Sequence, residues 1–201
     1  MQSFFYFFVL SLLVISCENN PDTGNVEGYF NQTSFDNDVV KNLPYYDSIK
    51  NIAVADLDTI FRFSNSRHIV DVSDGKGNIK KRQVDQPSYS FSYDFTRHMF
   101  LDYMGHQSLP DTIVHRLSTY FDKLGKQNIG GFTLDNDRTV KIAIKGIRDE
   151  KSNAEGGHFL IWQSKYERNS YPQLHIKDTV IAPGWTYQIY MEQKLNGGWP
   201  R

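Results

Sequence analysis

The chain has one cysteine, Cys17, among its 201 residues. No disulfide can therefore form within the chain, and the residues after Cys17 must fold through their hydrophobic core alone. The 22 Lys and Arg residues nearly balance the 23 Asp and Glu residues, so the charge gives no reason to expect nucleic acid as a partner. There is also no Gly-x-Ser-x-Gly element, phosphate-binding loop or dinucleotide fingerprint. We expect no cofactor.

Charged side chains are absent from the first 16 residues, MQSFFYFFVLSLLVIS, which are almost wholly apolar. This run is shorter than the roughly 20 residues that a membrane-spanning helix needs, and it matches the hydrophobic part of a secretory signal. No Lys or Arg precedes it, so the α-amino group supplies the only positive charge there. The run predicts that the chain leaves the cytoplasm.

The end of this stretch, Val14-Ile15-Ser16-Cys17, resembles the lipobox of bacterial lipoproteins. The resemblance implies cleavage before Cys17, lipidation of the cysteine and anchoring by acyl chains such as palmitate. The expected location is the cell envelope, with the lipid in a bacterial membrane, the outer membrane being favoured, and the domain in the periplasm or at the cell surface. The alternative is an uncleaved anchor helix or an ordinary signal, with an incidental cysteine.

The composition divides the chain into three parts: a signal peptide at 1–16, a lipidated cysteine and polar tether at 17–37, and a single α+β domain at 38–201. Aromatic residues make up 14% of the chain, which favours β-structure. We expect a largely antiparallel sheet of about seven strands, with one main helix, at about 110–124, packed on a face. The apolar stripe of that helix comprises Ile113, Val114, Leu117, Phe121 and Leu124.

The clearest strand is 88–95, in which Tyr89, Phe91, Tyr93 and Phe95 alternate with polar residues. Its ring face either packs into the core or forms a stacking platform for a planar ligand such as a sugar, and the core is favoured. The other expected elements, from turn residues and periodicity, are a short helix from Pro44, a helical turn at 96–104, a polar loop at 146–157, and strands at 57–63, 67–72, 79–84, 132–134, 139–145, 158–164, 176–181 and 185–193.

Two acids offer one possible catalytic site. Ile52–Thr59 runs as an apolar stretch into Asp56 and Asp58, and it resembles the nucleophile motif of haloacid-dehalogenase-like phosphatases. The resemblance implies that one carboxylate attacks phosphorus while the other works as acid and base. Here Thr59 follows Asp58 directly, and no later Gly-Asp-x-x-x-Asp metal motif is present. The alternative is the entry to a strand, with two exposed acids.

The histidines offer another possible site. His98, Asp102 and His106 are spaced by four, so on one helix they would share a face with Asp94 one turn earlier and could bind zinc. Gly105, however, is expected to end any helix before His106, and we expect no metal. The remaining histidines, His115, His158 and His175, have no serine, cysteine or acidic residue at a spacing that indicates a catalytic site.

We predict a non-catalytic envelope lipoprotein that acts as a binding or accessory module for an envelope protein. The expected contact surface comprises exposed aromatics on two strands together with the polar loop: Trp162, Trp185, Tyr187 and Arg148. The alternatives are an envelope hydrolase acting on phosphate or glycan groups, or an inhibitor or immunity lipoprotein. An enzyme requires the polar groups to converge in one pocket, whereas a binding module leaves them dispersed beside an apolar surface.

Overall fold

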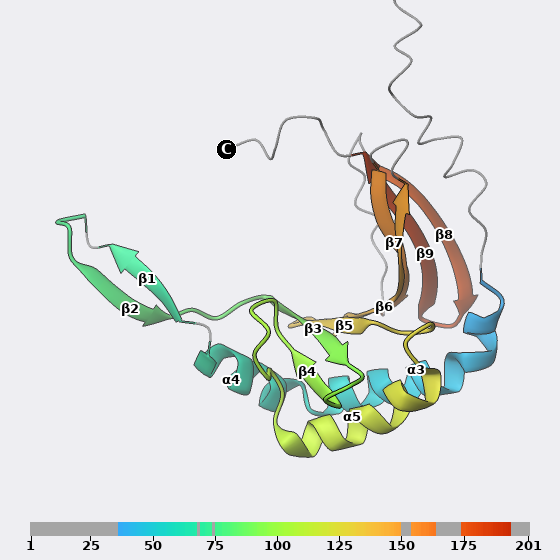
Figure 1. Ribbon diagram of the computed structural model, residues 1–201, viewed down its shortest axis with the longest axis horizontal. Coiled ribbons are helices and arrows are strands. Elements are labelled where there is room, and N and C mark those ends of the chain that lie inside the picture. Colours follow the sequence, from blue (N-terminus) through green and yellow to red (C-terminus); the bar gives the residue numbers. More distant parts are fainter. Residues whose placement is uncertain (1–35, 68, 74, 150–153, 164–173, 194–201) are drawn as a thin grey trace, which may run out of the picture.

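The protein is described by a computed structural model over residues 36–67, 69–73, 75–149, 154–163 and 174–193 (Figure 1). The predicted signal, Cys17, nearly all of the tether and the tail after residue 193 lie outside the described residues. Within those ranges, no helix is long and apolar enough to cross a membrane.

An antiparallel sheet of seven strands forms the body of the molecule, in the order β4-β3-β5-β6-β7-β9-β8. The expected α+β class and strand number are thus confirmed. A separate two-stranded ribbon projects from one end of the body (Figure 1). The strands are β1 (Ile69–Ser73) and β2 (Ile79–Gln83) in the ribbon, and β3 (Ser88–Asp94), β4 (Met99–Leu101), β5 (Gly131–Asp135), β6 (Val140–Asp149), β7 (Ala154–Trp162), β8 (Leu174–Ala182) and β9 (Trp185–Gln193) in the sheet.

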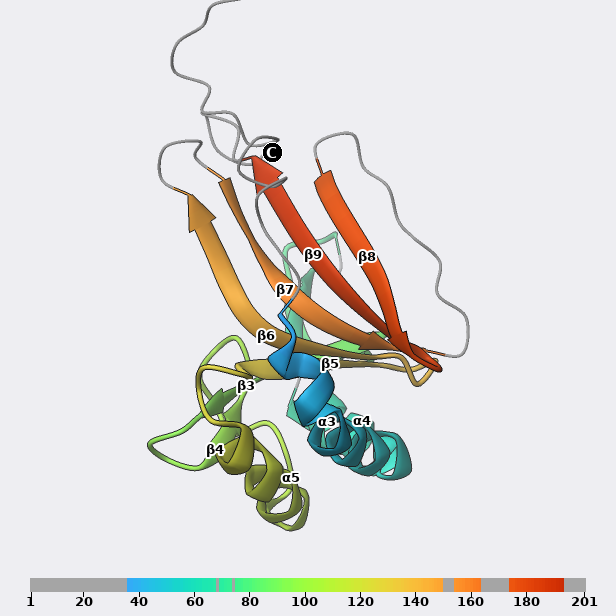
Figure 2. The same cartoon turned by 90° about the vertical axis from the view of Figure 1, so that its right-hand side faces the viewer.

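Three helices lie on one side of the sheet: α3 (Asp38–Ala55), α4 (Leu57–Arg67) and α5 (Asp111–Leu124) (Figure 2). The predicted helix at 110–124 is α5, which begins after Pro110 and ends before Gly125, a residue with φ 73°. It is not the single main helix that was expected, because α3 is longer, with 18 residues against 14, and packs beside it.

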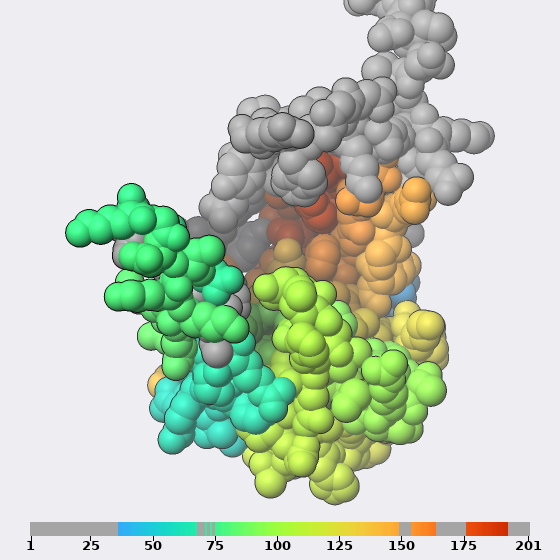
Figure 3. Space-filling view, turned by 60° about the vertical axis from the view of Figure 1, so that its left-hand side comes forward, coloured from blue at the N-terminus to red at the C-terminus, as the bar shows by residue number. Residues whose placement is uncertain are grey.

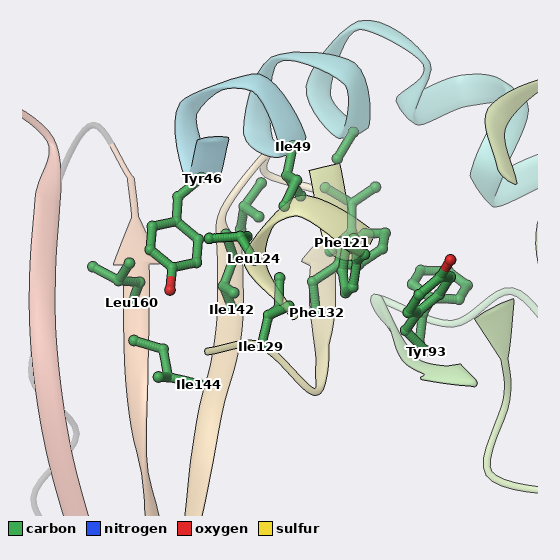
Figure 4. Close-up of a cluster of buried hydrophobic side chains, with 14 of the residues drawn as sticks. Tyr46, Ile49, Tyr93, Phe121, Leu124, Ile129, Phe132, Ile142, Ile144 and Leu160 are labelled. Atoms are coloured by element: carbon green, nitrogen blue, oxygen red, sulfur yellow. The ribbon is translucent and has the colours of Figure 1, made fainter. Parts of the chain in front are cut away.

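Buried side chains from α3, α5 and the sheet form the core (Figure 4), and aromatic rings of α5 and the sheet make up one part of it. The Phe121 ring lies 4.9 Å from that of Tyr93 and 4.8 Å from that of Phe100, centroid to centroid. Phe91 and Phe132 continue the cluster at 4.9 Å from each other. The ring face of β3 therefore packs into the core, as favoured from the sequence. From α3, the fully buried side chains are Tyr46, Ile49 and Ala53.

The strand expected at 57–63 is wrong, because this segment is helix α4. Buried Ile60 and Ser64 lie four residues apart, and Leu57 and Phe61 are partly buried beside them. Positions 57, 60, 61 and 64 share one face of a helix, which is the pattern that the strand prediction missed. The helix expected from Pro44 also begins earlier, at Asp38, whose N–H donates to the Asp36 carboxylate at 3.0 Å.

The helical turn expected at 96–104 is also wrong. The Asp94 carboxylate accepts hydrogen bonds from the N–H groups of Thr96 and Arg97, at 2.9 and 3.1 Å, and so reverses the chain. His98 then takes a left-handed backbone conformation with φ 51°. The chain returns along β3 as β4, which buries Phe100 completely.

The polar loop expected at 146–157 is wrong as well, because β6 and β7 continue through most of it. Gly146 pairs with Gly157, and Ile147 pairs with Gly156. A Cβ at Gly156 would lie 1.9 Å from the Tyr190 carbonyl oxygen of β9. The glycine therefore permits a close approach between strands rather than forming a turn.

We expect Gly156→Ala to destabilise the protein by about 1–3 kcal/mol, because the new methyl group meets backbone that has to shift. Gly146→Ala is the matched control, since its nearest neighbour, the Gly156 carbonyl oxygen, is 4.0 Å from the new Cβ. Urea unfolding of both variants gives the comparison. Equal free energies of unfolding would contradict the close approach of β7 to β9.

Candidate functional site

The two acids of the phosphatase-like motif do not follow a strand. Asp56 caps the end of α3, and Asp58 lies in the first turn of α4. The Asp56 carboxylate forms a salt bridge with Arg116 of α5 at 2.6 Å. Asp56 therefore ties two helices together, and the expectation of a strand ending in two free carboxylates is wrong.

His98 and His106 do not share a helix face either. His98 precedes β4, whereas His106 follows it in a tight turn built on Asp102. The Asp102 carboxylate accepts the N–H groups of Met104 and His106 at 2.9 and 3.0 Å. Among the described residues, no group of three or more His, Cys, Asp or Glu side chains is arranged to hold a metal.

His98 instead pairs with Asp122 of α5, which lies 24 residues later in the chain. The His98 Nδ1 atom lies 3.1 Å from Asp122 Oδ2, and the Tyr93 hydroxyl donates to Oδ1 of the same carboxylate at 2.9 Å. Burial, together with this hydrogen bond, raises the pKa of Tyr93 to about 12, so its hydroxyl stays a donor at neutral pH. The cluster borders a groove of about 350 Å³ that is also lined by His115.

A carboxylate on one ring nitrogen orients an imidazole, as it does in general-base catalysis. The nearby hydroxyls are committed elsewhere: Ser118 donates to the Val114 carbonyl at 2.7 Å, and Thr119 donates to the His115 carbonyl at 3.3 Å. The groove thus brings together two of the histidines singled out in the sequence, but neither hydroxyl stands ready as a nucleophile beside them.

The tryptophans of the expected contact surface hold α3 to the sheet. Trp185 and Tyr187 are 2% and 1% exposed, so the expectation that they are exposed is wrong. The Trp185 indole N–H donates to the Asp47 carboxylate of α3 at 2.9 Å. The Lys50 ammonium group lies 4.8 Å from the centre of the half-buried Trp162 ring. Arg148 is exposed on β6, opposite Glu155 of β7.

His158 is buried in the sheet and hydrogen-bonds to the Tyr187 hydroxyl through Nδ1. Burial, with the nearby Lys145 charge, lowers the pKa of His158 to about 4. Burial also raises the pKa of Tyr187 to about 12, so both groups are neutral at pH 7. This pair belongs to the core. The side chain of His175 lies outside the described residues.

A larger groove, of about 640 Å³, lies beside β3. One wall comes from the end of α4, with Ser64 and Arg67, and the other comes from the turn between β4 and α5. Tyr103 and Met104 at the tip of that turn are 84% and 63% exposed. Figure 3 shows the hollow between the β1–β2 ribbon and the segment that precedes α5. Tyr103 and Met104 thus form an exposed apolar tip beside the groove.

The turn that carries Tyr103 and Met104 is held from several directions. Besides the two hydrogen bonds to the Asp102 carboxylate, the Asp102 N–H donates to the His106 carbonyl at 2.9 Å. Gln107 pairs with Leu101 of β4, and its carbonyl accepts from the Arg67 guanidinium group of α4. The wall of the groove is therefore held in place by hydrogen bonds within the domain.

The side of β3 that faces this groove is a partly free strand edge. β3 pairs with β5 over Ser88–Ser92, but with β4 only over Ser92–Asp94. The Tyr93 N–H donates to the Gly130 carbonyl on the β5 side, at 2.9 Å. Backbone groups of successive strand residues point to opposite edges, so those of Ser88 and Ser90 point away from β5. Among the described strands, none pairs with them there.

Comparison with protein-family models, with curated proteins and with solved structures finds no match for the chain. Conclusions about its function therefore rest on the lipobox resemblance and on the geometry of these two grooves.

The depressed pKa of His158 predicts a pH-dependent stability. In the unfolded chain its pKa returns to about 6.5, so the unfolded state binds more protons between pH 6.5 and about 4. The free energy of unfolding should therefore fall as the pH drops through this window, by at most about 3 kcal/mol. His158→Gln should remove this part of the loss while keeping a partner for Tyr187. Urea unfolding of both proteins across this pH window measures the difference. Free energies of unfolding that fall equally with pH in the two proteins would contradict the prediction.

Proposed function

We propose that the protein is a non-catalytic envelope lipoprotein that binds a protein partner in the groove beside β3. The observation that carries this proposal is the partly apolar wall of that groove, with Tyr103 and Met104 exposed at its tip. The acids and histidines considered from the sequence are mostly dispersed, since Asp56 bonds to Arg116 and His106 lies beside Asp102. Dispersed polar groups beside an apolar surface favour binding over catalysis.

The lipid anchor is the second part of the proposal, and it rests on the resemblance of Val14–Cys17 to a lipobox. Acyl chains on Cys17 would hold the domain close to the membrane and raise its effective concentration near any membrane-borne partner. A modest affinity in the groove would then be sufficient for stable association. An inhibitor or immunity lipoprotein would use the same anchor and surface, with an incoming toxin as its partner.

An envelope hydrolase is the second candidate, and the pairing of His98 with Asp122 beside His115 favours it. An oriented imidazole in a groove could activate water for attack on a phosphate or glycan group. The test is hydrolysis of a chromogenic phosphate or glycoside by the wild-type protein and by His98→Gln. Activity that is present in the wild type and abolished by the substitution would support this function over binding.

We expect a Tyr103→Ser, Met104→Ser double variant to lose its partner when the tagged protein is crosslinked and recovered from its own cells. Removing two apolar side chains from the tip of the groove should weaken binding by about 2 kcal/mol or more while leaving the fold intact, since both are exposed. Mass spectrometry of the recovered material measures the loss.

Two further baits serve as controls. A Tyr45→Ser variant removes an exposed aromatic from α3, away from the groove, and should keep the partner.

Cys17→Ser should lose acyl labelling and move to the soluble fraction; if it stays membrane-bound and uncleaved, the N-terminus is an anchor helix. Retention of the same partner by the double variant would show that the groove is not the binding surface.

A further inference from the structure

The free edge of β3 is suited to a particular mode of binding. Ser88 and Ser90 each turn an N–H and a C=O group toward the groove, because Tyr93 donates in the opposite direction, to Gly130. An extended backbone laid along this edge would meet two donors and two acceptors at the spacing of a β-ladder. β4 already occupies the next part of the same edge, at Ser92–Asp94, so an added strand would continue its line.

The two faces of the added strand would meet different surroundings. On one side lie Tyr89 and Phe91, which line the groove together with the end of α4. On the other side lie the exposed hydroxyls of Ser88 and Ser90. Because side chains alternate between the faces of a strand, a ligand that alternates apolar and polar residues would satisfy both.

The charges around the groove favour an acidic ligand. Arg67 lines the groove, and β2 in the adjacent ribbon carries three exposed cations in succession, Lys80, Lys81 and Arg82. The described acids of the same segments are Asp102, which already accepts two backbone N–H groups, Asp111, which accepts from the Gln107 side chain, Asp71, which is opposite Lys81, and Asp85. Complementary charge would steer an acidic segment toward the edge and set its register.

We propose that the groove takes an extended, acidic segment of another protein, which adds to the free edge of β3 as a further strand. Main-chain hydrogen bonds to Ser88 and Ser90 supply affinity, while Arg67 and the β2 cations select acidic side chains. This inference rests on the proposed binding function and specifies how the partner is held.

The test is a selection of random, displayed octapeptides on the purified domain and on two Ser90 variants. Ser90→Pro removes the N–H that faces the groove but leaves the ladder to β5 intact, because Ser90 does not bond to β5 through its backbone. Ser90→Ala keeps that N–H and removes only the hydroxyl, which bonds to Thr133 at 2.8 Å. Circular dichroism and urea unfolding show whether each variant is folded.

We expect the selection on the wild-type domain to enrich acidic peptides that alternate apolar and polar residues. Their affinity should fall about tenfold or more with Ser90→Pro and remain within twofold with Ser90→Ala. If Ser90→Pro does not fold, the Lys80→Glu, Arg82→Glu double variant replaces it. This double variant should bind the same peptides more weakly and should gain binding to basic peptides.

Three results would overturn the inference: no enrichment, enrichment of basic peptides, or binding that neither Ser90→Pro nor the charge reversal changes. The proposed function fails differently: it is contradicted when the Tyr103→Ser, Met104→Ser double variant still recovers the same partner from cells. A partner that is lost with that double variant but is indifferent to Ser90→Pro would leave the binding function standing and exclude strand addition.

Discussion

The contact between the Phe121 ring of α5 and the rings of Tyr93 and Phe100 is the interaction on which the rest of the structure depends. These rings meet at centroid distances of 4.8–4.9 Å and are buried between the helix and the sheet. Since no disulfide can form within the chain, such burial has to supply the stability. α3 closes the same core further along, where the Trp185 indole bonds to Asp47.

β3 links this core to both grooves. Its inner face provides Phe91 and Tyr93 to the core, and the Tyr93 hydroxyl reaches out of the core to Asp122 beside His98. Its edge borders the larger groove, because β4 is short and the chain turns away at Asp102. One strand fixed by aromatic packing therefore positions both candidate surfaces, and Phe91 belongs to the core as well as to the lining of the larger groove.

Three elements that are marked by a clear local sequence pattern were predicted correctly. The apolar stripe of α5, the alternating rings of β3 and the strand at 185–193 were all apparent in the sequence, and the structure confirms them. The loop expected at 146–157 failed because glycine serves there for close approach to β9, which no local signal records. His98 lies in the turn between β3 and β4, and Asp122 lies on α5, so the two side chains come together only in the folded chain. The free edge of β3 exists only because β4 ends at Leu101. Such features depend on tertiary pairing, so the sequence pattern alone could not place them.

The most direct test of the central claim is backbone amide exchange in the segment 87–91, measured by mass spectrometry on the full-length protein in membranes of its own cells, where the proposed lipid anchor would hold it, and on the purified domain. In the purified domain, the amides of Ser88 and Ser90 should exchange quickly, while those of Tyr89 and Phe91, which face β5, are protected. In native membranes, with the partner present, Ser88 and Ser90 should become protected as well. Unchanged exchange at both residues, with the partner shown to be bound, would contradict the account.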